Sequence, residues 1–312
     1  MTDWLNKTHV GDCRELLRAM AADGVRVRAC VTSPPYFGLR DYGVPGQIGR
    51  EASPSEYIES LVGVFRLVRE ALADDGTLWL NLGDSYANDG KWGGSSGGKH
   101  VGPLHGGTGI GRGRRFTGAK PKDLLGIPWR VAFALQDDGW WLRSDCIWHK
   151  PNPMPESVTD RPTKAHEYFF LFAKAERYYF DADSIKESAT DTGRLNGREG
   201  RYEPPAARPP GTSPRTLARI DYTAQGRNKR TVWTVPTQPF SGSHFACFPP
   251  ELIKPCILAS AGPGDIVLDP FMGSGTTGQV ATDLGRHFIG CELNPEYVEL
   301  HELRRTTIGM PI

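Results

Sequence analysis

The sequence has no long hydrophobic run and no paired cysteine motif. No apolar stretch among its 312 residues approaches the ~18 that a membrane span needs. The first seven residues lack the apolar core of a secretory signal. The six cysteines form no C-x-x-C pair, so buried free thiols are expected rather than disulfides or a metal site. These absences predict a cytoplasmic protein without a structural metal.

The composition also excludes a disordered chain. Charged residues make up 23% and aromatic residues 10% of the sequence, which is typical of a chain that forms a core. Glycine (37) and proline (25) are about a fifth of all residues, below the roughly 25–30% that marks low complexity. We therefore expect one folded domain over residues 1–312, with long loops.

The net charge is only +1, but the basic residues are clustered. Residues 88–122 are expected to form a glycine-rich loop that carries seven Lys or Arg against one Asp. Residues 191–230 carry nine Lys or Arg against four acidic residues, within an irregular insert over 187–232. Such clustering favours a polyanionic partner. Solvated loops without a partner are the alternative.

Two segments have the pattern of an α/β fold. In the first, a β-branched strand over 26–32 ends at Ser33-Pro34-Pro35-Tyr36, named here the Ser-Pro-Pro-Tyr turn, because two prolines stop regular structure. Ser53 and Glu56 form the capping box of a helix that Pro54 begins and Asp75-Gly76 ends. A strand over 77–82 follows.

The second segment alternates strands and helices with short connections. We expect a helix from Pro249, a strand over 264–269, a helix over 277–284 and a strand over 287–292. Between the segments we expect a helix over 126–135 and strands over 140–148 and 167–173. The order predicts an α/β fold of Rossmann type, with a mixed, largely parallel sheet and helices on both faces.

Residues 273–277 (Gly-Ser-Gly-Thr-Thr), named here the glycine turn, connect a buried strand to a helix. Glycines let a ligand approach the backbone, and a helix N-terminus offers free N–H groups. Glu292 ends the next strand, where nucleotide-binding folds place the acid that accepts ribose hydroxyl groups. The pattern favours a ligand that contains a nucleoside. The missing G-x-G-x-x-G spacing argues against NAD, and a simple packing turn is the alternative.

The Ser-Pro-Pro-Tyr turn has groups that suit a planar base with an exocyclic amine. The Ser33 hydroxyl and the Pro34 carbonyl can accept the two amine hydrogens, and the Tyr36 ring can stack on the base. A proline-capped strand end without a ligand is the alternative.

The two turns together resemble the DNA amino-methyltransferases that use S-adenosylmethionine. Thr32 and the Ser-Pro-Pro-Tyr turn precede the segment from Asp269 to the glycine turn, an order similar to that of the circularly permuted beta class. The resemblance covers about two-thirds of the chain. It implies a Rossmann-like methyltransferase fold, transfer of a methyl group to a flipped base, and double-stranded DNA as partner. It also implies a bacterial, archaeal or phage source, and allows a homodimer and a cognate restriction enzyme.

Site residues follow from the resemblance by matching motifs. The catalytic residues would be Ser33, Pro34, Pro35 and Tyr36. The cofactor residues would be Asp12, Asp269, Phe271, Gly273, Ser274, Gly275, Thr276, Thr277 and Glu292. Trp148 and Lys150 lie in the segment that resembles the family's target-base segment, and Phe37 follows the catalytic turn, so these three are expected at the target base. Residues 88–122 and 191–230 match nothing in the family. Arg112, Arg114 and Arg115 are expected to contact DNA because of their charge, and the insert 187–232 is expected to be the target-recognition region, which varies most in this class. His244 and Phe248 would line the methionine end of the cofactor.

Several assignments have alternatives. Ser-Pro-Pro-Tyr resembles the N4-cytosine enzymes, while Asp-Pro-Pro-Tyr is commoner among N6-adenine enzymes, so N4 of cytosine is favoured over N6 of adenine. An RNA or protein amide methyltransferase and a non-enzymatic binder also remain. Trp148 is equally a core tryptophan, His166 and Glu167 are expected to form a structural pair, and Lys254 is expected to face solvent.

Overall fold

The computed structural model describes residues 3–39, 43–87, 118–188, 226–237 and 248–298. The strands are β1 (Lys7–Val10), β2 (Val27–Thr32), β3 (Leu72–Leu82), β4 (Trp141–His149), β5 (His166–Ala173), β6 (Val232–Thr234), β7 (Ile266–Asp269) and β8 (His287–Glu292). The helices are α1 (Cys13–Ala22), α2 (Pro54–Ala71), α3 (Ile127–Asp137), α5 (Pro250–Ser260) and α6 (Thr276–Asp283), with a 3-10 turn at Asp183–Ile185. None of these described helices has the length and apolar composition of a membrane span.

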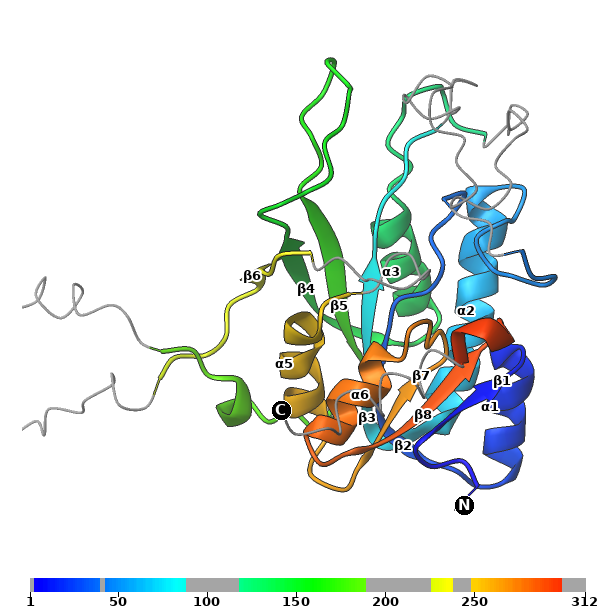
Figure 1. Cartoon of the computed structure of the whole chain (residues 1–312), viewed down its shortest axis with the longest axis vertical. Helices are drawn as coiled ribbons and strands as arrows, with labels where there is room; N and C mark the ends of the chain where they lie inside the picture. The colour runs from blue at the N-terminus through cyan, green and yellow to red at the C-terminus, as the bar shows by residue number, and fades with distance from the viewer. Residues whose placement is uncertain (1–2, 40–42, 88–117, 189–225, 238–247, 299–312) are drawn as a thin grey trace, which may run out of the picture. The chain divides into compact units, whose positions relative to one another are not determined.

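The strands form one mixed sheet in the order β1-β8-β7-β2-β3-β5-β4-β6 (Figure 1). β5 is antiparallel to both of its neighbours, and all other neighbours are parallel. The α/β prediction is confirmed, including the parallel β7-α6-β8 unit. Because β5 lies between β3 and β4, residues far apart in the sequence come together at this part of the sheet.

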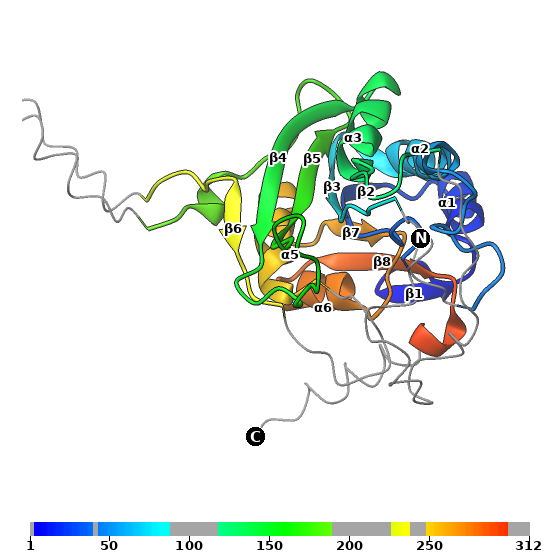
Figure 2. The ribbon, with the colours of Figure 1, turned by 90° about the horizontal axis from the view of Figure 1, so that it is seen from above.

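Helices cover both faces of the sheet, and alternate strand residues supply two cores (Figure 2). On one face, Leu78 and Leu80 of β3 pack with residues of α1, α2 and α3. On the other face, Trp79 packs with residues of α5 and α6, and its indole N–H donates to Ser260 at 2.8 Å. The helices on both faces confirm the prediction. The two cores fix the strands from which the two predicted turns begin.

The predicted helix ends were partly wrong. Ser53 caps α2 and accepts from the Glu56 amide at 3.2 Å, but the Glu56 carboxylate accepts from Ala52 rather than from Ser53. The helix also ends at Ala71, and β3 begins at Leu72. A register irregularity opposite Val27 and Ala29 accommodates the Asp-Gly segment inside the strand. The turn residues there mark a bulge instead of a helix end.

The chain divides into two compact units, one of residues Met1–Phe180 with Thr231–Ile312 and one of residues Asp181–Arg230. The second unit covers most of the insert predicted over 187–232. In its described part, Glu187 pairs with the main chain of Arg227, and its carboxylate lies within 3.4–3.6 Å of the side chains of Arg227, Lys229 and Arg230.

Candidate active site

The two predicted turns lie side by side at one edge of the sheet. β2 and β7 are parallel neighbours, with Ala29 opposite Val267 and Cys30 opposite Leu268. The chain leaves β2 into the Ser-Pro-Pro-Tyr turn and leaves β7 toward the glycine turn. The strand order reverses at this pair, with β3 on one side and β8 on the other. Open α/β sheets bind ligands at such a point.

A buried carboxylate connects the two turns. Asp269 is 2% exposed, and Thr32 and Thr277 each donate a hydroxyl hydrogen bond of 2.6 Å to it. The backbone amide of Phe271 donates a third bond at 3.0 Å. Because Thr32 precedes one turn and Thr277 ends the other, Asp269 fixes the turns relative to each other.

Two predicted cofactor residues have structural roles instead. Thr277 is fully buried, and its hydroxyl contacts Asp269 and the carbonyl of Val31, so it faces the protein interior and does not line the cavity described below. Gly275 also lies outside the lining. It has a left-handed φ of 81° at the N-cap of α6, a conformation that favours glycine.

Burial raises the pKa of the Asp269 carboxyl to about 6, although the hydrogen bonds from Thr277 and Thr32 oppose the rise. Since the folded pKa lies above the ordinary value of 3.8, the folded chain holds this proton more tightly than the unfolded chain. The contribution of Asp269 to stability is therefore greatest below about pH 4 and is lost as pH rises through about 6.

We predict a pH-dependent effect of Asp269→Asn on stability, because asparagine does not titrate. The stability of the variant relative to the wild type should improve by up to about 3 kcal/mol between pH 4 and pH 7. Urea unfolding of both proteins across this pH range measures the difference in their free energies of unfolding. The contributions of the other titrating groups largely cancel in this difference. A difference that stays constant with pH would show that Asp269 is not buried as a charged group.

A cavity that is partly open to solvent lies over the two turns. The predicted residues that line it are Asp12, Ser33, Pro35, Asp269, Phe271, Gly273, Ser274, Thr276 and Glu292. Phe248 also lines it, as predicted, together with residues between Val44 and Ile48 that the sequence gave no reason to select. His244 lies outside the described residues. The cavity thus combines both motifs, which was the main expectation from the sequence.

Glu292 holds the glycine turn against the end of β8. Its carboxylate accepts from the Gly273 amide at 2.9 Å and from the Asn294 amide at 2.8 Å. Burial raises the pKa of this carboxyl, and the two backbone hydrogen bonds oppose the rise. Gly273 itself has a left-handed φ of 53°. The turn is therefore shaped by glycine and fixed by a carboxylate that also faces the cavity.

Asp12 reaches the cavity from the N-terminus of α1. Its carboxylate accepts from the Arg14 amide at 2.8 Å and forms an ion pair with the Arg14 guanidinium. The hydrogen bond from Arg14 lowers the pKa of this carboxyl. Parallel pairing of β1 with β8 places Val10 opposite Glu292, so Asp12 and Glu292 lie at neighbouring strand ends.

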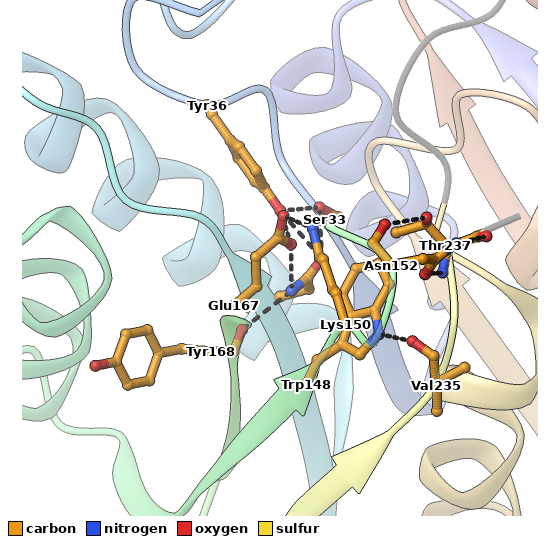
Figure 3. A network of polar contacts seen from close by, with 10 residues as sticks. Ser33, Tyr36, Trp148, Lys150, Asn152, Glu167, Tyr168, Val235 and Thr237 are labelled. Carbon is orange, nitrogen blue, oxygen red and sulfur yellow. Dashed lines mark hydrogen bonds and ion pairs between the residues drawn. The ribbon is translucent and has the colours of Figure 1, made fainter. Parts of the chain in front are cut away.

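The Ser-Pro-Pro-Tyr turn is held by hydrogen bonds from other elements (Figure 3). The Ser33 hydroxyl lies 3.3 Å from the side-chain oxygen of Asn81, and the Tyr36 hydroxyl donates to Glu167 at 2.7 Å. The Tyr57 hydroxyl donates to the Pro35 carbonyl at 2.8 Å. The turn is therefore preorganised with the Ser33 side chain at the cavity wall.

Glu167 and Asn81 are site residues that the sequence prediction missed. Glu167 was expected to pair with His166, but neighbouring strand residues point to opposite faces. Its carboxylate instead accepts from Tyr36 and Asn81 and forms an ion pair with Lys150. A carboxylate at the start of an otherwise apolar strand was the available signal. Asn81, at 1% exposure within β3, was another.

Two residues predicted to contact the base are buried. Phe37 is 4% exposed and packs against Tyr57, with ring centres 5.6 Å apart. Trp148 is also 4% exposed; its indole N–H donates to the Val235 carbonyl at 2.7 Å, and the Lys150 ammonium lies 4.2 Å from the ring centre. Both positions are those of core side chains, because the sheet and its neighbours cover the rings.

The remaining predictions on single residues have mixed outcomes. Lys150 lies at the site, where it pairs with Glu167. Lys254 is exposed on α5, as expected. Cys13, Cys30, Cys146, Cys256 and Cys291 are buried free thiols, as expected, and Cys247 lies outside the described residues. Arg112, Arg114 and Arg115 also lie outside the described residues, as does nearly all of the basic segment 88–122.

Comparison with known proteins gives a consistent result. A family model described as DNA methylase (N6_N4_Mtase) matches residues 27–303. The type II methyltransferase M.XycI of Xanthomonas campestris pv. cyanopsidis is 47% identical over 291 residues, which cover 93% of this chain and 84% of that protein. The type II methyltransferase M.SmaI of Serratia marcescens is 47% identical over 305 residues, covering 96% and 90%.

Solved structures share the fold at low sequence identity. PvuII DNA methyltransferase (cytosine-N4-specific) aligns with a TM-score of 0.60 and 20% identity, over 96% of this chain and 87% of that one. The M1.HpyAVI–SAM complex aligns with a TM-score of 0.54 and 17% identity, over 96% and 98%.

Proposed function

Since the chain belongs to the N6/N4 family of type II DNA methyltransferases, which use S-adenosylmethionine, we propose that it methylates N4 of a cytosine in double-stranded DNA. The observation that carries the proposal is the buried link from Thr32 through Asp269 to Thr277, which fixes both turns at one cavity. The base would leave the duplex to reach Ser33, at a cost of a few kcal/mol.

The cavity residues fit the cofactor. Glu292 and Asp12 present carboxylates that suit the ribose hydroxyls and the adenine end, and the amides at the start of α6 suit the carboxylate of the methionine part. When bound, S-adenosylmethionine supplies an electrophilic methyl group.

The Ser-Pro-Pro-Tyr turn would align the nucleophile. An exocyclic amine is a weak nucleophile because its lone pair is delocalised into the ring. Hydrogen bonds from the amine to the Ser33 hydroxyl and the Pro34 carbonyl would favour a geometry that directs the lone pair at the methyl group. Because the turn is held in place by Tyr57 and Glu167, this alignment needs little reorganisation in the transition state.

The basic residues outside the site would bind DNA. We propose that the segment 88–122, with Arg112, Arg114 and Arg115, contacts phosphates, and that the insert 187–232 reads the target sequence. Clustered positive charge supports the first assignment, and the separate compact unit Asp181–Arg230 supports the second. Phosphate contacts would offset part of the cost of flipping the base.

The choice of cytosine rests on the serine in the first position of the turn and can be tested directly. DNA from bacterial cells that express the protein would be digested to nucleosides and analysed by mass spectrometry. We expect N4-methylcytosine, at a much lower level in cells that express the Ser33→Ala variant. N6-methyladenine alone would assign the other base to this site.

We also predict that Glu292→Ala weakens cofactor binding more than it affects the chemical step. Loss of hydrogen bonds to a charged acceptor is worth about 1.5–3 kcal/mol, so the dissociation constant of S-adenosylmethionine should rise roughly tenfold or more. Calorimetric titration measures this constant. Glu296→Ala, at an exposed position four residues later, is the control that should bind normally. Unchanged affinity in Glu292→Ala would remove the residue from the cofactor site.

A further inference from the structure

A line of oxygen atoms leads from the cavity wall to a carboxylate that does not line the cavity. The Ser33 hydroxyl lies 3.3 Å from the side-chain oxygen of Asn81 and 3.5 Å from the Tyr36 hydroxyl, the latter at the outer limit of a hydrogen bond. The Tyr36 hydroxyl donates to Glu167 at 2.7 Å. Figure 3 shows these groups converging from the Ser-Pro-Pro-Tyr turn and from β5. Catalytic hydrogen bonds that are long in a free enzyme often tighten when the substrate binds.

The proposed reaction leaves a proton to be removed. When the amine nitrogen bonds to the methyl group, it becomes positively charged and must lose one hydrogen. Ser33 faces the amine, but a serine hydroxyl cannot keep an additional proton. Among the described residues, Glu167 is the carboxylate to which the Ser33–Tyr36 pair is hydrogen bonded.

We propose that Glu167 is the final acceptor of this proton, received through Tyr36 and Ser33. The amine N–H bond breaks as its proton passes to the Ser33 oxygen. The Ser33 proton passes to the Tyr36 oxygen, and the Tyr36 proton passes to the carboxylate, so both hydroxyl groups are restored. The positive charge lost from the sulfonium is balanced by the neutralised Glu167. This inference rests on the proposed amine methylation, whichever base carries the amine.

The surroundings of Glu167 suit this role. Lys150 forms an ion pair with one carboxylate oxygen, and Asn81 donates to the other at 3.2 Å. These contacts orient the oxygen that faces Tyr36. Burial is the main cause that raises the pKa of the Tyr36 hydroxyl, and the negative charge of Glu167 is the second. The tyrosine therefore stays protonated and can both donate and accept a hydrogen bond. Glu167 does not touch the base, so it is a positioning residue that acts through the turn.

The test compares variants that separate proton acceptance from packing. Glu167→Gln keeps the shape and an acceptor oxygen but cannot take a proton, whereas Glu167→Asp keeps a carboxylate on a shorter side chain. Single-turnover methyl transfer should fall roughly 10²-fold or more in Glu167→Gln. It should recover in part in Glu167→Asp. The dissociation constants of cofactor and DNA should change little in either. Glu156→Gln, which loses a more exposed ion pair with Arg161, is the control.

A second comparison tests the path itself. Tyr36→Phe removes the middle hydroxyl, so the double variant with Glu167→Gln should be no slower than the slower single variant. Full single-turnover activity in Glu167→Gln, activity of Glu167→Gln above that of Glu167→Asp, or multiplicative losses in the double variant would overturn the proposal. Absence of methyl transfer to DNA by the wild type would instead overturn the proposed function.

Discussion

Replacing Ser33 with alanine is expected to lower the single-turnover rate of methyl transfer roughly 10²–10³-fold. The side chain lines the cavity, and its oxygen is one of two groups that would accept hydrogens of the amine. The hydrogen bond matters most in the transition state, because the amine becomes more acidic as it is alkylated. The loss should therefore affect the rate of the chemical step rather than binding.

The cofactor dissociation constant and the thermal stability of Ser33→Ala are the controls. Both should stay near the wild-type values, because the hydrogen bonds from Tyr36 and from Asn81 to Glu167 remain when the serine hydroxyl is removed. A variant with wild-type turnover would show that Ser33 is not the group that aligns the amine. A variant that loses cofactor binding would show that Ser33 contacts the cofactor rather than the target base.

Gly83→Ala should lower the single-turnover rate of methyl transfer by roughly 10²-fold, although residue 83 would contact no substrate. A Cβ atom at Gly83 would lie 2.5 Å from Cε2 and 2.9 Å from Cδ2 of the Tyr36 ring. The ring cannot move freely, because its hydroxyl is bonded to Glu167. The added methyl group would therefore displace the Ser-Pro-Pro-Tyr turn, and a displacement near 1 Å is enough for a loss of this size.

Gly63→Ala gives the matched control for this prediction. Gly63 lies in α2, and a Cβ atom there would meet nothing within 4 Å. This variant should keep full activity and gain roughly 0.5–1 kcal/mol of stability from the higher helix propensity of alanine. Equal activity of Gly83→Ala and Gly63→Ala would show that the position of the Tyr36 ring does not limit the reaction.

The strongest local patterns predicted most of the fold. The capping residues and helical period of α2 predicted that helix, although its stop signal was misplaced. The sequence from β7 through α6 to β8 combines a strong period with clear stop signals, and all of these elements are present. β1 and β6 were not predicted as strands. They have four and three residues, and most of these are half-buried or exposed, so neither has a readable hydrophobic pattern.

The parts of the candidate site that are made of residues close together in the sequence could be predicted. The glycine turn, Ser33 and Glu292 were each selected from local chemistry, and the structure brings them to one cavity. The bond between Tyr36 and Glu167 joins residues 131 positions apart. It depends on the antiparallel placement of β5 beside β3, which no local pattern specifies.

Two of the predicted site residues are buried beside the turns. Thr277 and Phe37 lie beside the residues that form the cavity, so sequence proximity suggested contact with a ligand. In the structure their side chains point inward, where Thr277 hydrogen bonds to Asp269 and Phe37 packs on Tyr57. A polar or aromatic residue next to a functional turn can equally be the support that fixes it.

A crystal structure with a cofactor analogue and an unmethylated DNA duplex that carries the target sequence would test most directly whether both turns serve one reaction. The analogue should occupy the space between Glu292 and Phe248, and an extrahelical cytosine should place its amine nitrogen within hydrogen-bonding distance of the Ser33 hydroxyl. An analogue bound away from Glu292, or a flipped base whose amine lies beyond the reach of Ser33, would contradict a shared cavity.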